Sequence, residues 1–166
     1  FLFLFILVLH NSCVQNISEP ERENIEISNT FIDLDRFNNE LFFQVVTNQN
    51  ESQALINTVS VKLMYIGDEI HTYSGEFQLY DNGTNGDLIS ANGIYSLLTY
   101  ADTVNLPNIA PVIKNIIMPQ NFMLDDTKSD SLDIAVIIYG KVFQLIAQVH
   151  DTLNKEIVSA KNINLD

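Results

Sequence analysis

Hydrophobic and polar residues alternate along much of the chain between residues 31 and 100. A period of two is typical of a β-strand with one buried face. The clearest alternation lies in 59–65, which places one set of side chains on a single face: Val59, Val61, Leu63 and Tyr65. Shorter or weaker alternation predicts strands at 31–35 and 76–79, and apolar runs bounded by polar residues predict strands at 41–46 and 94–100. Helical spacing is absent from this half and polar turns recur at short intervals, so we predict a β-sandwich over residues 30–103.

Residues 107–166 show the same kind of pattern with fewer elements. Apolar runs predict strands at 111–116, 134–139, 142–149 and 156–160, with a turn at 150–155. A sandwich needs about seven strands, more than this half supplies. We therefore expect either a second, partial or truncated β unit, or a set of strands that packs with residues 30–103 as one fused fold.

The start of the chain carries an export pattern. Residues 1–9 form an uninterrupted apolar run, too short for a transmembrane helix but matching the hydrophobic region of a secretory signal. The only cysteine, Cys13, follows it after Ser12, which resembles the lipobox of bacterial lipoproteins; His10 and Asn11 depart from that pattern. The resemblance implies a signal over 1–13, lipidation of Cys13 and a membrane-anchored protein of the periplasm or cell surface. An ordinary cleaved signal and an uncleaved anchor are the alternatives.

The polar, Glu- and Asn-rich residues 14–29 then predict a flexible tether.

Composition narrows the functional classes. The chain has a formal net charge of −13, with 8 Lys and Arg against 21 Asp and Glu. Such a surface has too few cations to neutralise a run of phosphates, so we expect no nucleic-acid partner. The acidic surface is compatible with the binding of cations, and it is equally compatible with a role in solubility alone. The apolar fraction of 46% is sufficient for a core.

A glycine-rich loop lies between the predicted strands 76–79 and 94–100. Gly83, Gly86 and Gly93 permit the positive φ angles of tight turns, and the neighbouring asparagines tolerate them. A structural turn therefore explains the composition. A calcium site is the alternative, with oxygen ligands from four residues: Asp81, Asn85, Asp87 and Asn92. The spacing is not that of an EF-hand.

The same loop resembles the pattern Asp-Asp-Gly-x-x-Gly-Asp-x-x-Ala-Gly-Asp-Gly-x-Tyr of immunoglobulin-like modules in bacterial secreted and surface proteins. The positions that agree are Asp81, Gly83, Gly86, Asp87, Ala91, Gly93 and Tyr95. Asn92 stands where the pattern has Asp, and one glycine before it is missing, which weakens the calcium interpretation more than the fold. The resemblance implies an immunoglobulin-like sandwich and an accessory role. Pro111 sits in an Asn-x-x-Pro-x-Ile segment like the opening of a tandem module of this kind, which would make residues 107–166 a second such unit.

Few residues suggest chemistry. The histidines are His10 in the leader, His71 in an extended segment and His150. His150 and Asp151 are adjacent, and neighbouring strand residues point to opposite faces, so we expect a turn there and not an acid–base pair. No nucleophile elbow, zinc-protease, P-loop or dinucleotide motif occurs in the sequence.

We therefore expect a non-catalytic display, spacer or adhesion module with an unidentified protein or polysaccharide partner. The alternative is an accessory carbohydrate- or protein-binding module, or a fragment of a larger secreted hydrolase. Exposed aromatic side chains would favour that alternative, and the candidates are Tyr65, Tyr73 and Tyr80. An enzyme is a third hypothesis, which would require a concave pocket holding His150 with two acids.

Overall fold

The computed structural model describes residues 24–48, 55–101, 109–117 and 134–166. Its elements, in chain order, are β1 (Ile27–Asp35), β2 (Glu40–Thr47), β3 (Ile56–Tyr65), β4 (Phe77–Leu79), β5 (Ile94–Tyr100), α1 (Ile109–Ile117), α2 (Ile134–Ile138), β6 (Val142–Asp151) and β7 (Glu156–Asn164). The predicted signal over 1–13, Cys13 and residues 14–23 of the predicted tether lie outside the described residues. The prediction of a tether is wrong for residues 27–29, because β1 begins at Ile27.

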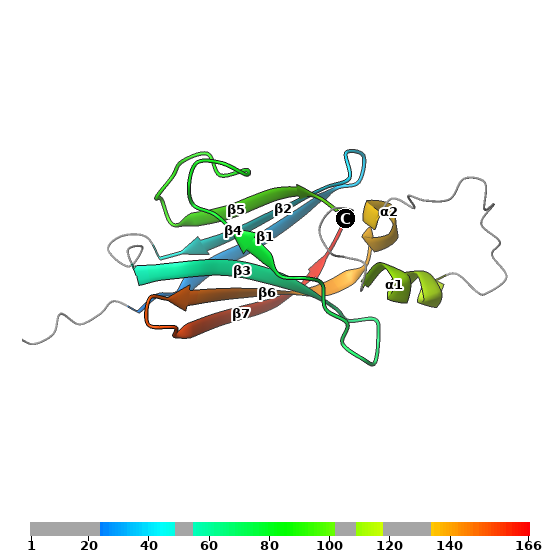
Figure 1. The fold of residues 1–166 in the computed structure, drawn as a ribbon. Helices are drawn as coiled ribbons and strands as arrows, with labels where there is room; N and C mark the ends of the chain where they lie inside the picture. The colour runs from blue at the N-terminus through cyan, green and yellow to red at the C-terminus, as the bar shows by residue number, and fades with distance from the viewer. Residues whose placement is uncertain (1–23, 49–54, 102–108, 118–133) are drawn as a thin grey trace, which may run out of the picture.

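The strands form two antiparallel sheets packed face to face (Figure 1). One sheet has the order β1-β2-β5 and the other has the order β4-β3-β6-β7. The prediction of an all-β sandwich is confirmed. Its basis is visible in β2, where Leu41, Phe43 and Val45 are fully buried and alternate with half-exposed residues. The side chains of one face can leave water only by meeting the other sheet, so the core lies between the layers.

Strands from the two predicted units belong to one sheet. β3, from the first half, pairs with β6, from the second half, in a register that runs from Ile56↔Asp151 to Tyr65↔Phe143. β6 also pairs with β7 along the whole of that strand. Of the alternatives for residues 107–166, the structure therefore shows the fused fold, in which these strands complete a sheet begun by the first half.

Two predicted strands are helices. Residues 111–116 fall in α1 and residues 134–138 form α2. In α1 the fully buried Ile109 and Ile113 are about one helical turn apart, and Lys114, which follows Ile113, is exposed. Pro111 lies in the first helical turn, where its missing N–H removes no helical hydrogen bond. Short apolar runs of this kind fit a strand or a helix equally well by periodicity.

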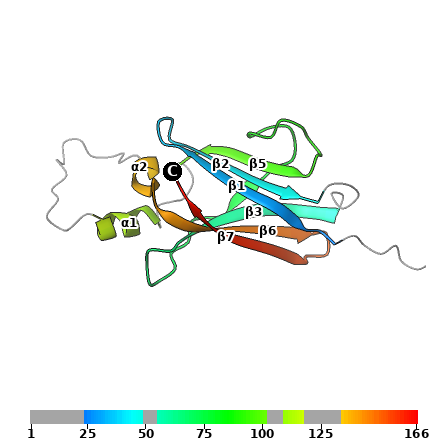
Figure 2. The same ribbon diagram turned by 180° about the vertical axis from the view of Figure 1, so that it is seen from behind.

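The two helices lie together at one end of the sandwich, where the chain also ends (Figures 1 and 2). Ile109, Ile113, Ala135 and Ile138 are fully buried and belong to the same core cluster as the strand residues. The helices thus cover apolar side chains at this end of the core. No helix among the described residues is long and apolar enough to cross a bilayer.

Two aromatic pairs join core residues. Phe43 of β2 stacks on Phe77 of β4 with ring centroids 4.7 Å apart, so this pair spans the two sheets. Tyr65 and Phe143 lie 5.6 Å apart at the end of the β3–β6 pair. Stacked aromatic pairs bury large apolar areas and fix the relative position of the elements that carry them.

Replacing Phe43 with alanine should destabilise the fold by about 3–5 kcal/mol, because the substitution leaves a cavity between the sheets and removes the stacking on Phe77. The measurement is the free energy of unfolding from urea denaturation. Phe37→Ala is the matched control, since Phe37 is 86% exposed and its loss should cost less than about 1 kcal/mol. Equal effects of the two substitutions would contradict the packing described here.

Candidate functional site

The glycine-rich loop carries the chain from one sheet to the other. β4 pairs with β3 in the four-stranded sheet, whereas β5 pairs with β2 in the three-stranded sheet. The crossing starts at Tyr80, whose N–H donates to the Ser96 carbonyl at 3.0 Å and whose carbonyl accepts from the Ser96 N–H at 2.8 Å. In Figure 1 the loop leaves β4 and bends back beside β5. It therefore closes this lateral side of the sandwich.

Asp81 closes the base of the loop. Its Oδ1 accepts a hydrogen bond from the Asn92 N–H at 3.1 Å, and its Oδ2 accepts one from the Gly93 N–H at 2.9 Å. Hydrogen bonds between a carboxylate and backbone N–H groups are stronger than those between neutral groups. The two ends of the loop, separated by about a dozen residues in sequence, are thereby held together.

Asp87 organises the interior of the loop. Its side chain is 5% exposed; Oδ2 accepts from the Gly83 N–H at 2.6 Å and Oδ1 accepts from the Ile89 N–H at 3.2 Å. The Asp87 N–H itself donates to the Thr84 carbonyl at 3.0 Å, which closes a four-residue turn. The central residues of this turn, Asn85 and Gly86, have φ angles of 56° and 90°. Positive φ at both positions is characteristic of a type I′ turn, for which Asn-Gly is the preferred sequence.

The two central residues of this turn, Asn85 and Gly86, pack against the three-stranded sheet. The Leu98 N–H of β5 donates to the Asn85 carbonyl at 2.7 Å. A Cβ atom at Gly86 would lie 2.8 Å from Cε2 of Phe42 in β2. Such a distance is a steric clash, so glycine is required here both by the backbone angle and by the aromatic ring.

The predicted calcium ligands occupy two places in the loop. Asp81 and Asn92 lie at its base, whereas Asn85 and Asp87 belong to the four-residue turn. Both carboxylates accept backbone N–H groups, while Asn92 Oδ1 accepts from the Ile94 N–H at 2.9 Å. In the described part of the chain, no three or more His, Cys, Asp or Glu side chains are grouped as a metal site would need. Calcium binding stays a prediction, and the structural-turn interpretation accounts for these contacts.

Tyr95 begins the strand that follows the loop. It lies opposite Val45 on the core-facing side of β5. Burial, with a smaller contribution from the nearby charge of Asp81, raises the pKa of its phenol to about 12. The folded protein thus favours the neutral phenol. Gly83 and Gly93, the other predicted structural glycines, have φ angles of 75° and 81°.

Two apolar side chains at the loop surface were not singled out by sequence reasoning. Leu88 is 93% exposed and Ile89 is 64% exposed. The sequence does contain the pattern that could have identified them, which is an apolar pair inside an otherwise polar loop. Since Asp87 immediately before them is fixed by its hydrogen bonds, these side chains project from an ordered turn and not from a free segment.

The tyrosines proposed as exposed aromatics divide into two groups. Tyr65 is 6% exposed and packs on Phe143 in the core, so its prediction as a surface residue is wrong. Its position in the alternating run had already placed it on the same face as Val61 and Leu63. Tyr73 and Tyr80 are 46% and 42% exposed.

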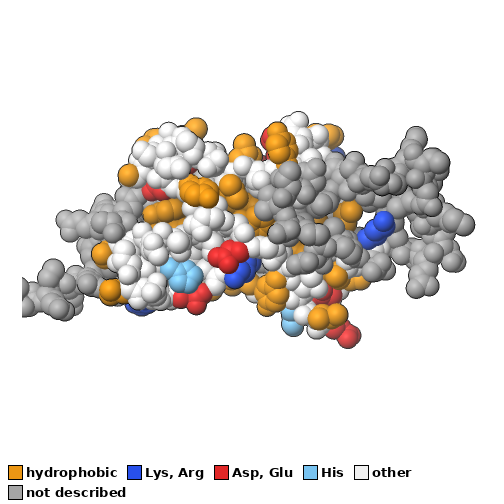
Figure 3. Space-filling model, viewed as in Figure 1, with side chains coloured by type: hydrophobic (Ala, Val, Ile, Leu, Met, Phe, Trp, Pro, Cys, Tyr) orange, Lys and Arg blue, Asp and Glu red, His pale blue; other side chains and the backbone are white. Residues whose placement is uncertain are grey.

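His150 lies on the outer face of the four-stranded sheet. Its Nε2 is 3.9 Å from Glu156 Oε1 of β7, and Lys62 of β3 forms an ion pair with Glu76 at 3.5 Å. The nearby Ser60 hydroxyl has the largest effect and lowers the pKa of Glu76; burial opposes it, and the Lys62 ammonium lowers the pKa by a smaller amount. Figure 3 shows this face, with a histidine beside one acidic side chain and a basic side chain beside another.

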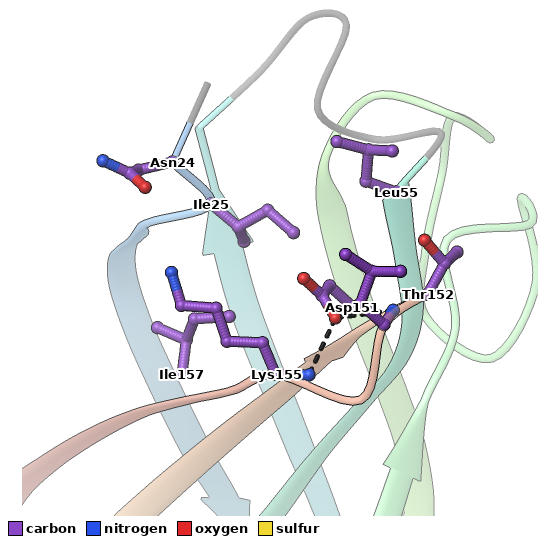
Figure 4. Close-up of a pocket in the computed structure, with 8 residues that line it drawn as sticks. Asn24, Ile25, Leu55, Asp151, Thr152, Lys155 and Ile157 are labelled. Carbon is purple, nitrogen blue, oxygen red and sulfur yellow. Dashed lines mark hydrogen bonds between the residues drawn. The ribbon is translucent and has the colours of Figure 1, made fainter. Parts of the chain in front are cut away.

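A cavity formed by described residues does not include His150. It has a volume of about 140 Å³ and lies at the turn between β6 and β7 (Figure 4), lined by Asn24, Ile25, Leu55, Asp151, Thr152, Leu153, Lys155 and Ile157. Asp151 Oδ1 accepts from the backbone N–H groups of Leu153 and Lys155, both at 2.8 Å. Its carboxylate therefore shapes the turn, as the sequence predicted for this segment.

Comparison with models of protein families, with curated proteins and with solved structures gave no match.

Replacing Gly86 with alanine should destabilise the fold by about 2–4 kcal/mol, because the new methyl group meets the Phe42 ring and also has an unfavourable φ. Gly140→Ala is the matched control: its φ is 69°, but its Cβ would meet nothing within 4 Å, so we expect a loss of about 1 kcal/mol. The measurement is the free energy of unfolding. Equal losses would show that the loop does not rest on Phe42.

Stability should fall as pH rises from about 10 to about 12, since over this range the folded state retains the Tyr95 proton that the unfolded chain releases. The contribution is complete below the pKa of the unfolded chain, and it is lost as pH passes the folded value. Tyr95→Phe should reduce the slope of unfolding free energy against pH in this range, because phenylalanine has no proton to release. An unchanged slope in Tyr95→Phe would contradict the raised pKa.

Proposed function

We propose that the chain is an exported, lipid-anchored β-sandwich module that acts in display, spacing or adhesion at a cell surface and not in catalysis. The observation that carries this proposal is the loop between β4 and β5. Its two carboxylates are used to order its own backbone, and its exposed tip presents Leu88 and Ile89 to solvent. Recognition sites are frequently loops of this kind on a rigid scaffold.

The strand order supports an immunoglobulin-like module. In the constant-type immunoglobulin fold, strands A, B, E and D form one sheet and strands C, F and G form the other. The order β1-β2-β5 corresponds to A-B-E, and the order β3-β6-β7 corresponds to C-F-G. The difference is β4, which pairs with β3 and not with β5. The helices α1 and α2 stand between the strands that correspond to E and F.

Order within the loop favours a role in contact with a partner. Apolar side chains on a mobile segment lose conformational freedom on binding, and this loss lowers affinity. Leu88 and Ile89 follow directly on the turn that is closed by the Asp87 N–H and the Thr84 carbonyl. The tip is thus already constrained before a partner arrives, and its exposed apolar surface is available for burial.

An accessory carbohydrate-binding module is the second candidate. Tyr73 is half-exposed and forms a β-bridge with Met64, which places it at the edge of the four-stranded sheet. Lys62 lies two residues before Met64 on β3, and its ion-pair partner Glu76 lies three residues after Tyr73. An exposed ring beside polar groups is a combination that can stack on a sugar and donate hydrogen bonds to it.

Metabolic labelling with an alkyne-tagged palmitate tests the anchoring part of the proposal. In a bacterial host that exports the chain, we expect lipid label and membrane association for the natural chain. Cys13→Ser should lose both, because that residue is the only cysteine. Ser12→Ala, which keeps a small residue before the cysteine, is the matched control and should retain both. Label in Cys13→Ser, or none in the natural chain, would contradict lipidation.

Retention on insoluble neutral polysaccharides, with cellulose and chitin as the probes, separates the two candidates. A contact module that uses the loop should not be retained through its tyrosines. Retention that is lost in Tyr73→Ala and kept in Leu88→Ser would favour the carbohydrate-binding alternative and overturn the loop as the contact surface. Both residues are exposed, so these substitutions should leave the fold intact.

A further inference from the structure

An unprotected strand edge can pair with another chain, and β-proteins block their edges for this reason. The two sheets of this sandwich have four lateral edges, formed by β1, β5, β4 and β7. Within the described residues, the first three are blocked in different ways. β7 is not, and it therefore stands apart as a candidate interaction surface.

The three blocked edges are recognised from their pairing. β1 contains a register shift between Ile27 and Asn29, which twists the start of this edge, and the Lys161 side chain lies against its Thr30 carbonyl. β4 has only 3 residues. β5 is covered by the glycine-rich loop, through the Tyr80–Ser96 bridge and the hydrogen bond from Leu98 to Asn85.

β7 has none of these features. It is 9 residues long, contains no proline, and pairs with β6 without any shift from Val142↔Asn164 to His150↔Glu156. Its one lysine, Lys161, lies opposite the buried Leu145 and donates a hydrogen bond from Nζ to the Thr30 carbonyl of β1. The charge that usually guards an edge is thus directed toward the neighbouring sheet and not outward along the edge.

We propose that β7 is a dimerisation edge, on which the β7 strand of a second copy of this chain pairs in antiparallel fashion about a two-fold axis through Ala160. Ala160 is the central residue of β7, so this register uses the whole strand. It places Ile157 opposite Ile163 of the second copy on the core-facing side. On the outer side it places Val158 opposite Asn162, with the two small Ala160 side chains at the axis.

The neighbouring registers are less favourable. In the combined sheet, core-facing residues of one copy must lie opposite core-facing residues of the other copy. Odd-numbered residues of β7 must therefore pair with odd-numbered residues, so the two-fold axis must pass through a residue and not between two residues. An axis at Ser159 would place Ile157 opposite Lys161. An axis at Lys161 would place two like charges directly opposite each other, which is destabilising. Of these three axes, only the one at Ala160 places isoleucine opposite isoleucine.

A second copy fits this edge better than an unrelated strand, because the edge is complementary to itself. The isoleucines lie symmetrically about Ala160, and Glu156 meets the neutral Asn164. The chain carries a net charge of −13, and copies therefore repel at long range. Glu156 is the one acidic residue in β7, and in the proposed register it lies opposite the neutral Asn164 of the second copy. Two copies can therefore pair at this edge without placing two carboxylates opposite each other.

The experiment uses the full chain in a mild nonionic detergent, because residues 1–9 are apolar. Molar mass is measured by light scattering at chain concentrations from about 1 to 100 µM. We expect a dimer that dissociates on dilution. Ala160→Lys should raise the dissociation constant at least about tenfold, because two ammonium groups would meet at the axis. Ala160→Thr, which keeps a small side chain that suits a strand, is the control and should still dimerise.

Disulfide capture tests the register. In a Cys13→Ser background, chains with Val158→Cys and chains with Asn162→Cys are prepared separately and then mixed under mild oxidation. We expect a cross-link between the two kinds of chain and little within either kind, because residue 158 meets residue 162 of the second copy. Asp33→Cys in β1 should not cross-link.

Three results would overturn the proposal. The first is a monomeric mass at every concentration, which would leave β7 unpaired or reserved for a different strand. The second is a dimer whose dissociation constant is unchanged by Ala160→Lys, which would place the contact elsewhere, for example in the apolar leader. The third is cross-linking of each cysteine chain with itself but not with the other, which would exclude the axis at Ala160.

Discussion

The pairing of β3 with β6 is the interaction on which the rest of the structure depends. It unites strands that are about 90 residues apart, and it supplies most of the four-stranded sheet. Without that sheet, the buried faces of β1, β2 and β5 would have no apolar layer to meet. The aromatic stack of Phe43 on Phe77 and the helical cover at one end of the core both follow from this arrangement.

The glycine-rich loop is a consequence of the same architecture. The chain must leave β4 in one sheet and enter β5 in the other, and it completes the crossing at the sandwich edge. A compact path of this kind leaves backbone N–H groups without strand partners, and buried N–H groups need acceptors. Asp81 and Asp87 supply those acceptors, which explains acidic side chains in a loop without reference to a cation.

The strands that could be predicted are those whose alternation is long. In β2, β3 and β6 the period of two marks the buried face residue by residue. The helices could not be predicted, because the apolar runs at 109–117 and 134–138 are too short for periodicity to separate helix from strand. The division into two units failed because no local pattern reveals that β3 and β6 are partners. In the loop, the glycines were found from residue type and Tyr95 from the resemblance to the immunoglobulin-like pattern. The use of the carboxylates depends on backbone positions that only coordinates give.

The proposed contact loop and the proposed dimer edge lie on opposite lateral sides of the sandwich. β7 contacts β1 at one side, whereas β4 contacts β5, beside the loop, at the other. Pairing through β7 would extend one sheet from β4 of one copy to β4 of the second and leave both loops exposed at its far ends. Two loops on one assembly bind a repetitive surface more tightly than either loop alone, because the second contact is intramolecular. A module with one modest apolar tip therefore gains most from an edge that joins two copies.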